Sequence, residues 1–334
     1  MHASCHWLTR SGAFVLCLLC GVGVAIVLIE ALRYDHRAGS AFRAIVSAPL
    51  AERLQQPFPR LMDDTHGKRL VISRPPQRIV SQTLGTDEIL LAICDPQRIV
   101  ALSPLADDAT YSNVTAQARG IVGRANAGAE QILHFHPDLV FVASYSKAEL
   151  VALLTMAQAP VWRFTDFDHL DDIKMNIRLI GYLIGEDHHA ETLVQSMEHT
   201  IAQVRARIPR DAPPVRVMLY DLSGYTGGTH TTFDDMVRVV GATNVAAVHG
   251  IKGFRKISRE QLLQWNPDVI ITSADLGVAA ETRHQLLQDP AIAVTRAGQQ
   301  QRVIVLQSSF FLTVTHHIVR GIEQLAHELY RLRS

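Results

Sequence analysis

The sequence predicts an α/β protein of two lobes with mainly parallel sheets, joined by one long helix and separated by a cleft. Short apolar runs alternate with amphipathic helical stretches along most of the chain, which is typical of parallel sheets. Residues 169–208 instead keep apolar side chains at helical spacing. The sequence after this stretch repeats features of the sequence before it. We therefore expect one lobe on each side of a helical connection.

The elements of the first lobe follow from apolar runs and turn residues. Residues 60–73, RLMDDTHGKRLVIS, predict a β-hairpin because Asp-Asp-Thr-His-Gly supplies a turn between apolar arms. A helix is expected over 85–94, with Thr86 or Asp87 as its N-cap. Further strands are predicted at 78–82, 98–103, 137–144 and 159–164, and further helices at 128–135 and 147–157.

The central stretch predicts two helices, the second running from about Asp187 to Ile208 as a backbone between the lobes. In the second lobe, GYTGGTHT reads as a loop. Strands are expected there at 215–223, 267–273 and 302–307, and helices at 232–241, 258–265, 282–289 and 316–332.

The two lobes echo each other in one particular unit. AEQILHFHPDLVFVAS in the first lobe corresponds to SREQLLQWNPDVIITS in the second. Each is a helix with an early Glu-Gln, a polar corner, Pro-Asp and a buried strand, so a whole lobe element is repeated. Two such Rossmann-like lobes form a cleft between them, and a cleft is the default place for a ligand. A single connecting helix predicts only modest closure.

Composition excludes some classes of function. The 334 residues are 48% hydrophobic, which suits one or two cores, and 32 basic residues balance 32 acidic ones. A nucleic-acid binder would show a basic excess. Cys94 is the only cysteine after residue 20, so the body forms no internal disulfide, and we interpret Cys94 as a small core residue.

The N-terminus predicts a membrane segment. Residues 13–32 are apolar except for Glu30, which is long enough to span a bilayer and longer than the apolar core of most secretory signals. We expect an uncleaved signal anchor, with a cleaved signal peptide as the alternative. Lipidation at Cys20 is disfavoured because Leu19 precedes it and the apolar run continues. The predicted division is a tail (1–12), the apolar segment (13–32), a linker (33–59), the N-terminal lobe (60–186), the connecting helix (187–208) and the C-terminal lobe (209–334).

The chain carries none of the common enzyme signatures. G-x-S-x-G, Walker A, G-x-G-x-x-G after the first strand and H-E-x-x-H are all missing. The Gly-rich GYTGGTH could form a backbone anion nest, but it does not lead into a P-loop helix. We therefore expect no enzyme, no catalytic residue and no cofactor.

The order and spacing of several segments resemble a known family. The segments are DDTHGKRLVISRPPQRIVS, GTDEILLAI, AEQILHFHPDLVFVAS, NIRLIGYLIGEDHHAETLV, SREQLLQWNPDVIIT and RVIVL, and together they cover roughly residues 60–330. The chain is similar to the substrate-binding proteins of ABC importers for iron-siderophore, haem and cobalamin. The resemblance implies two lobes joined by a rigid helix, an extracytoplasmic location at the inner membrane, and an ABC permease with its ATPase as partner.

The resemblance also implies a docking role for two glutamates. Members of the family present one Glu on each lobe to arginines of the permease, and these match Glu130 and Glu260 in the echoed helices. Two carboxylates, one per lobe, would set encounter and orientation more than affinity. The alternative is that each Glu only stabilises the first turn of its helix.

The ligand that the resemblance implies is a metal chelate, with an iron(III) siderophore favoured over cobalamin or haem. Arg124 lies six residues before Glu130 and Tyr145 follows the next strand, which is similar to hydroxamate-siderophore members. Aromatic side chains suit the apolar surface of a chelate, and Arg suits its oxygens. The expected ligand contacts, on loops at the lobe interface, are Tyr111, Arg124, Tyr145, Trp162, Tyr225, Phe254, Arg255, Phe310 and Phe311.

Histidine pairs do not predict a protein-bound metal. His134 and His136 flank a corner before Pro137, where convergence on one ion is doubtful. We expect His188 and His189 to be exposed, and one of His316 and His317 to lie near the cleft mouth. A rival function remains, namely a membrane-tethered ligand sensor without a transport role.

Overall fold

The computed structural model describes residues 45, 47–63, 69–126, 128–209 and 213–330. The predicted tail, the apolar segment 13–32 and most of the linker lie outside the described residues. Within the described ranges, no helix has both the length and the apolar character needed to cross a membrane.

The first lobe is built on a parallel sheet with the strand order β5-β4-β3-β6-β7. Its strands are short and apolar, and the interior strand β6 is buried along its whole length, as expected for a sheet covered on both faces. A separate antiparallel hairpin, β1 (Arg60–Asp63) with β2 (Arg69–Ile72), confirms the predicted hairpin. The sheet strands are β3 (Ile79–Ser81), β4 (Ile99–Leu102), β5 (Gly123–Arg124), β6 (Leu139–Ala143) and β7 (Val161–Phe164).

Helices connect these strands. Thr83 is the N-cap of α3 and accepts a hydrogen bond from the Thr86 amide, so the prediction of Thr86 or Asp87 as N-cap was wrong. Because the backbone of Thr83 is extended, the helix begins at Leu84. Asp87 and Glu88, in the first turns of the helix, are buried. The helices are α3 (Leu84–Ile93), α4 (Thr115–Ala118), α5 (Ala129–His134) and α6 (Ala148–Met156), with short 3₁₀ turns η1 (Pro96–Arg98) and η2 (Pro104–Asp107).

The second lobe repeats this architecture with a four-stranded parallel sheet of order β10-β8-β12-β13. The GYTGGTHT segment is not only a loop, because β9 (Tyr225–Gly227) pairs antiparallel with β11 (Phe254–Lys256) beside the sheet. The sheet strands are β8 (Arg216–Leu219), β10 (Thr243–Asn244), β12 (Val269–Ala274) and β13 (Val303–Gln307). The helices are α9 (Thr232–Val239), α10 (Val245–Val248), α11 (Arg259–Trp265), α12 (Ala279–Gln288), α13 (Pro290–Ala293), α14 (Arg296–Gln299), α15 (Ser308–Phe311) and α16 (Ile318–Tyr330).

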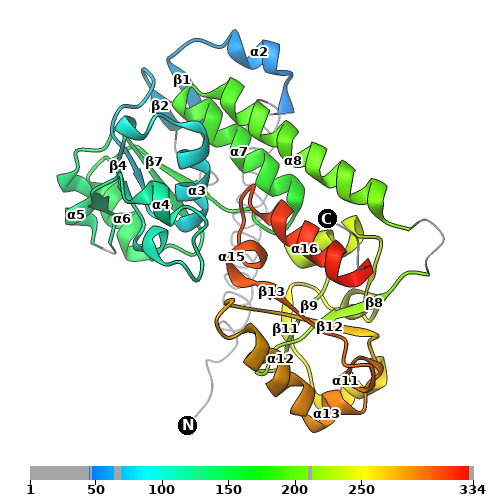
Figure 1. Cartoon of the computed structure of the whole chain (residues 1–334). Coiled ribbons are helices and arrows are strands. Elements are labelled where there is room, and N and C mark those ends of the chain that lie inside the picture. Colours follow the sequence, from blue (N-terminus) through cyan, green and yellow to red (C-terminus); the bar gives the residue numbers. More distant parts are fainter. Residues whose placement is uncertain (1–44, 46, 64–68, 127, 210–212, 331–334) are drawn as a thin grey trace, which may run out of the picture.

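Two antiparallel helices, α7 (Leu170–Ile184) and α8 (Asp187–Arg207), run between the lobes along one side of the molecule (Figure 1). Helix α7 ends at Gly185 in the left-handed conformation, which allows the tight turn into α8. Gly181 lets the two helices approach closely, because a Cβ there would lie 2.4 Å from the Cβ of Ala190. Helix α8 spans almost the same residues as the predicted connecting helix.

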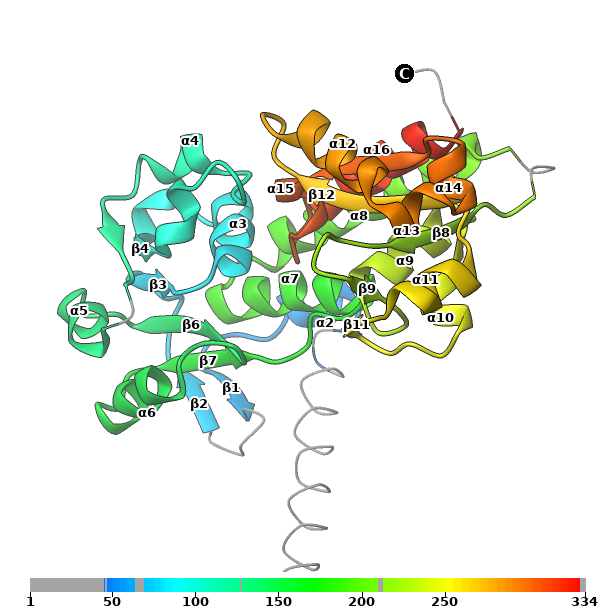
Figure 2. The same ribbon diagram turned by 90° about the horizontal axis from the view of Figure 1, so that it is seen from below.

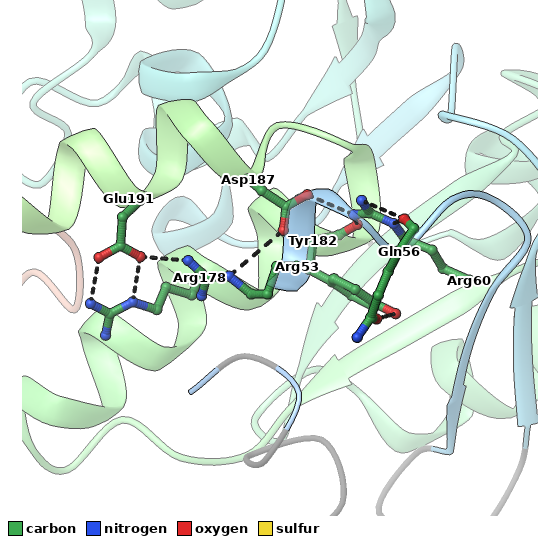
Figure 3. Close-up of polar contacts among 7 residues, drawn as sticks. All are labelled: Arg53, Gln56, Arg60, Arg178, Tyr182, Asp187 and Glu191. Carbon is green, nitrogen blue, oxygen red and sulfur yellow. Dashed lines mark hydrogen bonds and ion pairs between the residues drawn. The ribbon is translucent and has the colours of Figure 1, made fainter. Parts of the chain in front are cut away.

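A buried ionic network fastens the segment before the first lobe to these helices (Figure 3). Arg53 of α2 (Leu50–Leu54) is 1% exposed and donates to Glu191 at 2.5 Å. Glu191 also accepts two hydrogen bonds of 2.9 Å from Arg178 of α7. Arg60 pairs with the buried Asp187 at 2.8 Å and lies over the ring of Tyr182. The segment 53–60 is thus held against the connecting helices by charges that are shielded from water.

Candidate ligand-binding cleft

A cavity of about 200 Å³ lies where the two lobes meet. Its first-lobe residues all follow the carboxyl ends of strands: Leu84 and Gly85 follow β3, Leu105 and Tyr111 follow β4, and Tyr145 follows β6. Ligands of open α/β sheets bind at this edge, because the connecting loops converge there. The second lobe contributes Leu312, Thr313 and Val314, which follow β13 and α15.

The cavity lining is apolar and unusually exposed. Tyr111, Tyr145 and Leu312 are 42%, 65% and 54% exposed. Leu222 and Leu276, which follow β8 and β12 of the second lobe, are also exposed large apolar residues. Exposed apolar side chains thus lie at the carboxyl ends of strands in both lobes. Such exposed apolar surface is typical of sites that bind a ligand or a partner.

Arg124 does not present a free donor to this cavity. Its Nε and Nη2 pair with the two oxygens of Asp107 at 2.6 Å each. Its remaining N–H groups donate to the backbone carbonyls of Ala118, Ile121 and Gly123. All five guanidinium N–H groups are therefore used within the protein. The side chain fastens β5 to the loop that carries Tyr111.

Two predicted contacts are core residues in this structure. Trp162 is 2% exposed, because alternate side chains of β7 point into the core, and its ring lies 6.5 Å from that of Phe164. Phe311 is 7% exposed and packs edge-on against Phe233. We expected both side chains to contact the ligand, but both are buried and neither lines the cavity.

The other predicted contacts are dispersed. Tyr225, Phe254 and Arg255 lie on the β9–β11 pair and are exposed, but they are not among the residues that line the cavity. Phe310 lies under the guanidinium of Arg320, 5.4 Å from the ring centroid. Among the predicted site residues, the structure brings Tyr111 and Tyr145 together.

Glu130 and Glu260 occupy equivalent places. Each is the second residue of its helix, α5 or α11, and each is exposed. The Ser258 side chain and the α11 backbone lower the pKa of Glu260, so it stays ionised at neutral pH. The two helices lie on different lobes, well apart in Figure 2. Both carboxylates therefore lie at the surface, one on each lobe.

A buried glutamate that the sequence did not single out joins the lobes. Glu88 of α3 is fully buried and accepts hydrogen bonds from Asn113 on its own lobe. Its second oxygen accepts from the hydroxyls of Thr313 and Thr315, at 2.9 and 2.5 Å, on the other lobe. Asn113 adds a bond to the carbonyl of Ser309. Glu88 therefore forms a buried polar contact between the lobes, beside the cavity that Thr313 lines. This contact is called the floor of the cleft below.

The histidine pairs have local roles. His136 has a left-handed backbone at the corner before Pro137, and Asn266 has the same conformation before Pro267. The rings of His316 and His317 are tilted by 38° with centroids 4.0 Å apart, and burial lowers the pKa of His316 to about 3. Within the described ranges, no three His, Cys, Asp or Glu side chains are arranged to hold a metal ion.

Comparison with known proteins agrees with this geometry. The family model described as periplasmic binding protein matches residues 79–310, which include both sheets and the first-lobe residues of the cavity. The chain belongs to the periplasmic binding protein family. This family consists of non-enzymatic transport components, which confirms the predicted fold class and the prediction that the chain is not an enzyme.

Individual members of the periplasmic binding protein family are distant relatives. The ABC transporter substrate-binding lipoprotein YvrC of Bacillus subtilis is 23% identical over 84% of this chain and 88% of its own length. The molybdate-binding protein MolA of Haemophilus influenzae is 28% identical, but the match covers 53% of this chain and 55% of MolA.

Solved structures of the family share the fold. The haem-binding protein RhuT from Roseiflexus sp. RS-1 superposes with a TM-score of 0.64 and 26% identity, covering 76% of this chain and 98% of RhuT. A periplasmic binding protein from Veillonella parvula reaches 0.70 at 18% identity, covering 80% of this chain and 95% of that protein.

Proposed function

We propose that this protein is the extracytoplasmic substrate-binding component of an ABC importer and that it captures an iron chelate between its lobes. The observation that carries the proposal is the cavity whose apolar lining comes from both lobes. Membership of the periplasmic binding protein family and the similarity to YvrC support the transport role. The predicted apolar segment at residues 13–32 would hold the protein at the inner membrane.

The lining favours a chelate without net charge. The residues around the cavity are aliphatic side chains, two tyrosines, a threonine and a glycine, and none of them is ionic. A highly charged ligand would lose its hydration there without gaining an opposite charge. A ferric hydroxamate siderophore, in which three anionic groups neutralise Fe³⁺, fits this requirement. Molybdate fits it less well, because a small dianion needs several converging hydrogen-bond donors.

Haem is the second candidate. The exposed Tyr111 and Tyr145 could cover a flat macrocycle, and the 26% identical RhuT is named a haem-binding protein. Cobalamin requires the same apolar lining. To identify the ligand, the purified protein is titrated in parallel with a ferric trihydroxamate, haem and cobalamin, and the quenching of tryptophan fluorescence is measured. Binding of the trihydroxamate alone supports the siderophore, whereas binding of only haem or only cobalamin contradicts it.

Delivery to the permease is tested through the two exposed glutamates. Reversing both charges, Glu130→Arg with Glu260→Arg, should abolish the stimulation of ATP hydrolysis by the reconstituted importer and leave ligand affinity unchanged. Glu149 and Glu281 lie exposed in the first turns of α6 and α12. Reversing that pair instead is a matched control and should have little effect. Full stimulation by the Glu130/Glu260 variant would favour the membrane-tethered sensor.

A further inference from the structure

A line of hydroxyl groups leads from the ligand cavity into the first lobe. Tyr145 lines the cavity, and its hydroxyl is hydrogen-bonded to the side chain of Thr83, the N-cap of α3. The hydroxyls of Thr83 and Thr86 are 2.9 Å apart, and the Thr86 hydroxyl lies 2.6 Å from that of Ser81 at the end of β3. These four side chains form the hydroxyl line.

The hydroxyl line ends at the carboxyl group of Asp87. The Ser81 hydroxyl is hydrogen-bonded to this carboxyl. Ser103, which follows β4, donates to it from its backbone amide at 3.1 Å and from its hydroxyl at 2.5 Å. Asp87 and the serines and threonines around it are buried, so their hydrogen bonds are formed with each other rather than with bulk water.

Few charges surround Asp87. Glu88, the next residue of α3, accepts hydrogen bonds from the other lobe. The Asp87 charge acts on Arg124 of β5, which is already paired with Asp107 of η2. Helices α7 and α8, which also pack on α3, contribute apolar side chains to the shared core.

Asp87 therefore changes its charge near neutral pH. Burial raises the pKa of Asp87 to about 7, although hydrogen bonds from Ser103 and Ser81 lower it and Glu88 raises it slightly. Burial, and to a smaller extent the Asp87 charge, raise the pKa of Tyr145, so that Tyr145 keeps its proton over the range in which Asp87 titrates.

An ionised Asp87 fixes the direction of every hydrogen bond in the hydroxyl line, because each hydroxyl has one proton to donate. A carboxylate can only accept, so Ser81 donates to it. Thr86 must then donate the 2.6 Å bond to Ser81, and Thr83 must donate the 2.9 Å bond to Thr86. Tyr145 has to donate to Thr83, and only the lone pairs of its oxygen are left for the cavity.

A neutral Asp87 releases this direction. Its O–H can donate to Ser81, and each hydroxyl can then donate toward the cavity instead. Thr83 donates to Tyr145, and the Tyr145 proton becomes available to a ligand. The side chain at the cavity surface thus changes from a hydrogen-bond acceptor to a donor.

We propose that Asp87 is a positioning residue that makes Tyr145 a hydrogen-bond acceptor in the ligand cavity. This inference rests on the proposed function and adds a preference within its ligand class. No ionic side chain lines the cavity, and the Thr313 hydroxyl is already bonded to Glu88. The direction of the Tyr145 proton therefore favours ferric hydroxamates that carry N–H donors over those that carry only acceptors.

Carbon-13 NMR of the full chain in detergent, labelled at the Cζ of its 7 tyrosines, tests the direction of the Tyr145 hydrogen bond. The Tyr145 signal, assigned by its loss in Tyr145→Phe, should shift with a midpoint near pH 7. The shift should vanish in Asp87→Asn. It should also vanish in Thr86→Val, which interrupts the hydroxyl line but keeps Asp87, and Thr86→Ser should restore it. Tyr111 lines the same cavity, so its signal is the internal control.

Ser103→Ala keeps the hydroxyl line intact and moves the titration. This substitution removes a hydrogen bond that lowers the pKa of Asp87, so the midpoint of the Tyr145 shift should move to higher pH. Circular dichroism confirms that each variant is folded. A native Tyr145 signal that stays constant between pH 5.5 and 8.5, or a shift in Thr86→Val equal to the native one, overturns the proposal. None of these readouts needs a ligand.

Binding of two neutral chelates separates this inference from the proposed function. Tris(acetohydroxamato)iron(III) carries an N–H on each hydroxamate, whereas tris(N-methylacetohydroxamato)iron(III) carries none. Excess hydroxamic acid keeps both chelates intact. At pH 8 the native protein should prefer the first chelate by about 3- to 10-fold. The preference should decrease at pH 6 and be lost in Tyr145→Phe.

The outcomes of the binding experiment differ in meaning. Equal binding of the two chelates by the native protein at both pH values overturns the preference. If neither chelate binds while the Tyr145 shift is present, the proposed chelate ligand is wrong and the action of Asp87 on Tyr145 is supported.

Discussion

At the scale of single residues, the echoed corners of the two lobes use the same contacts. Arg78 donates to the carbonyls of Phe135 and His136, and Arg216 donates to those of Trp265 and Asn266. Asp138, which follows Pro137, accepts from the backbone amides of Gln77 and Arg78 just before β3. Asp268, which follows Pro267, accepts from the backbone amide of Arg216 at the start of β8. The histidine at the first corner therefore occupies a structural position that asparagine fills equally well.

Arg124 acts through the loop that it fastens rather than by touching the ligand. Arg124→Ala should weaken ligand binding, because the segment carrying Tyr111 loses three hydrogen bonds, two at Asp107 and one at Ala118. Asp107→Asn removes the ion pair without approaching the cavity, and it should weaken binding in the same direction. Fluorescence titration of both variants measures this. If Asp107→Asn leaves affinity unchanged or raises it while Arg124→Ala lowers it, Arg124 contacts the ligand directly.

Glu191 should make stability depend on acid pH. Hydrogen bonds from Arg178, and then from Arg53, lower its pKa from 4.5 to about 2. A lowered pKa stabilises the folded state above the unfolded value of 4.5, and the stabilisation is lost as the pH falls toward 2. Because the carboxyl is partly screened by water, the stabilisation amounts to about 1–2 kcal/mol at neutral pH and decreases steadily below pH 4.5.

Urea unfolding of the native protein and of Glu191→Gln, repeated between pH 7 and pH 3, measures this stabilisation. The difference in the free energy of unfolding should shrink as the pH is lowered. A difference that is independent of pH would mean that the ion pairs with Arg53 and Arg178 contribute no net stability.

At the scale of elements, α7 and α8 are in contact because a glycine and an alanine face each other. Gly181→Ala should lower the free energy of unfolding by about 1–3 kcal/mol, because the new methyl group has no space beside Ala190. Adding Ala190→Gly should restore part of the loss, although glycine within a helix costs about 1 kcal/mol. Urea unfolding of the single and double variants measures both effects. Additive losses in the double variant would show that these side chains do not meet.

At the scale of the whole molecule, Glu88 links the lobes at the floor of the cleft. Glu88→Ala should leave the hydroxyls of Thr313 and Thr315 without their acceptor and cost about 2–4 kcal/mol. Hydrogen exchange should rise at residues 111–114 and 309–317 more than in the strands of either sheet. Glu281→Ala, on the exposed face of α12, is the control. A uniform rise in exchange would indicate general destabilisation rather than separation of the lobes.

The sequence by itself determined the architecture, because strand and helix periods, turn residues and the repeated Glu-Gln…Pro-Asp unit are local or nearly local signals. It placed the sheet strands β3, β4, β6, β7, β8, β12 and β13 and the two connecting helices. It missed β9 and β11, whose pairing joins residues about 30 apart within a Gly-rich segment that carries little strand propensity.

The tertiary structure decided which side chains are available for function. The residue types of Trp162, Arg124 and Phe311 predicted contacts with a chelate. In the structure, Trp162 and Phe311 are buried, and the N–H groups of Arg124 form hydrogen bonds within the protein. The contacts of Glu88 across the lobes and the hydroxyl line from Tyr145 toward Asp87 depend on segments that only folding brings together. The sequence shows which side chains have the chemistry to bind a ligand. Long-range packing decides which of them are exposed and which groups they contact. The fold was therefore predictable from local patterns, whereas most of the site was not.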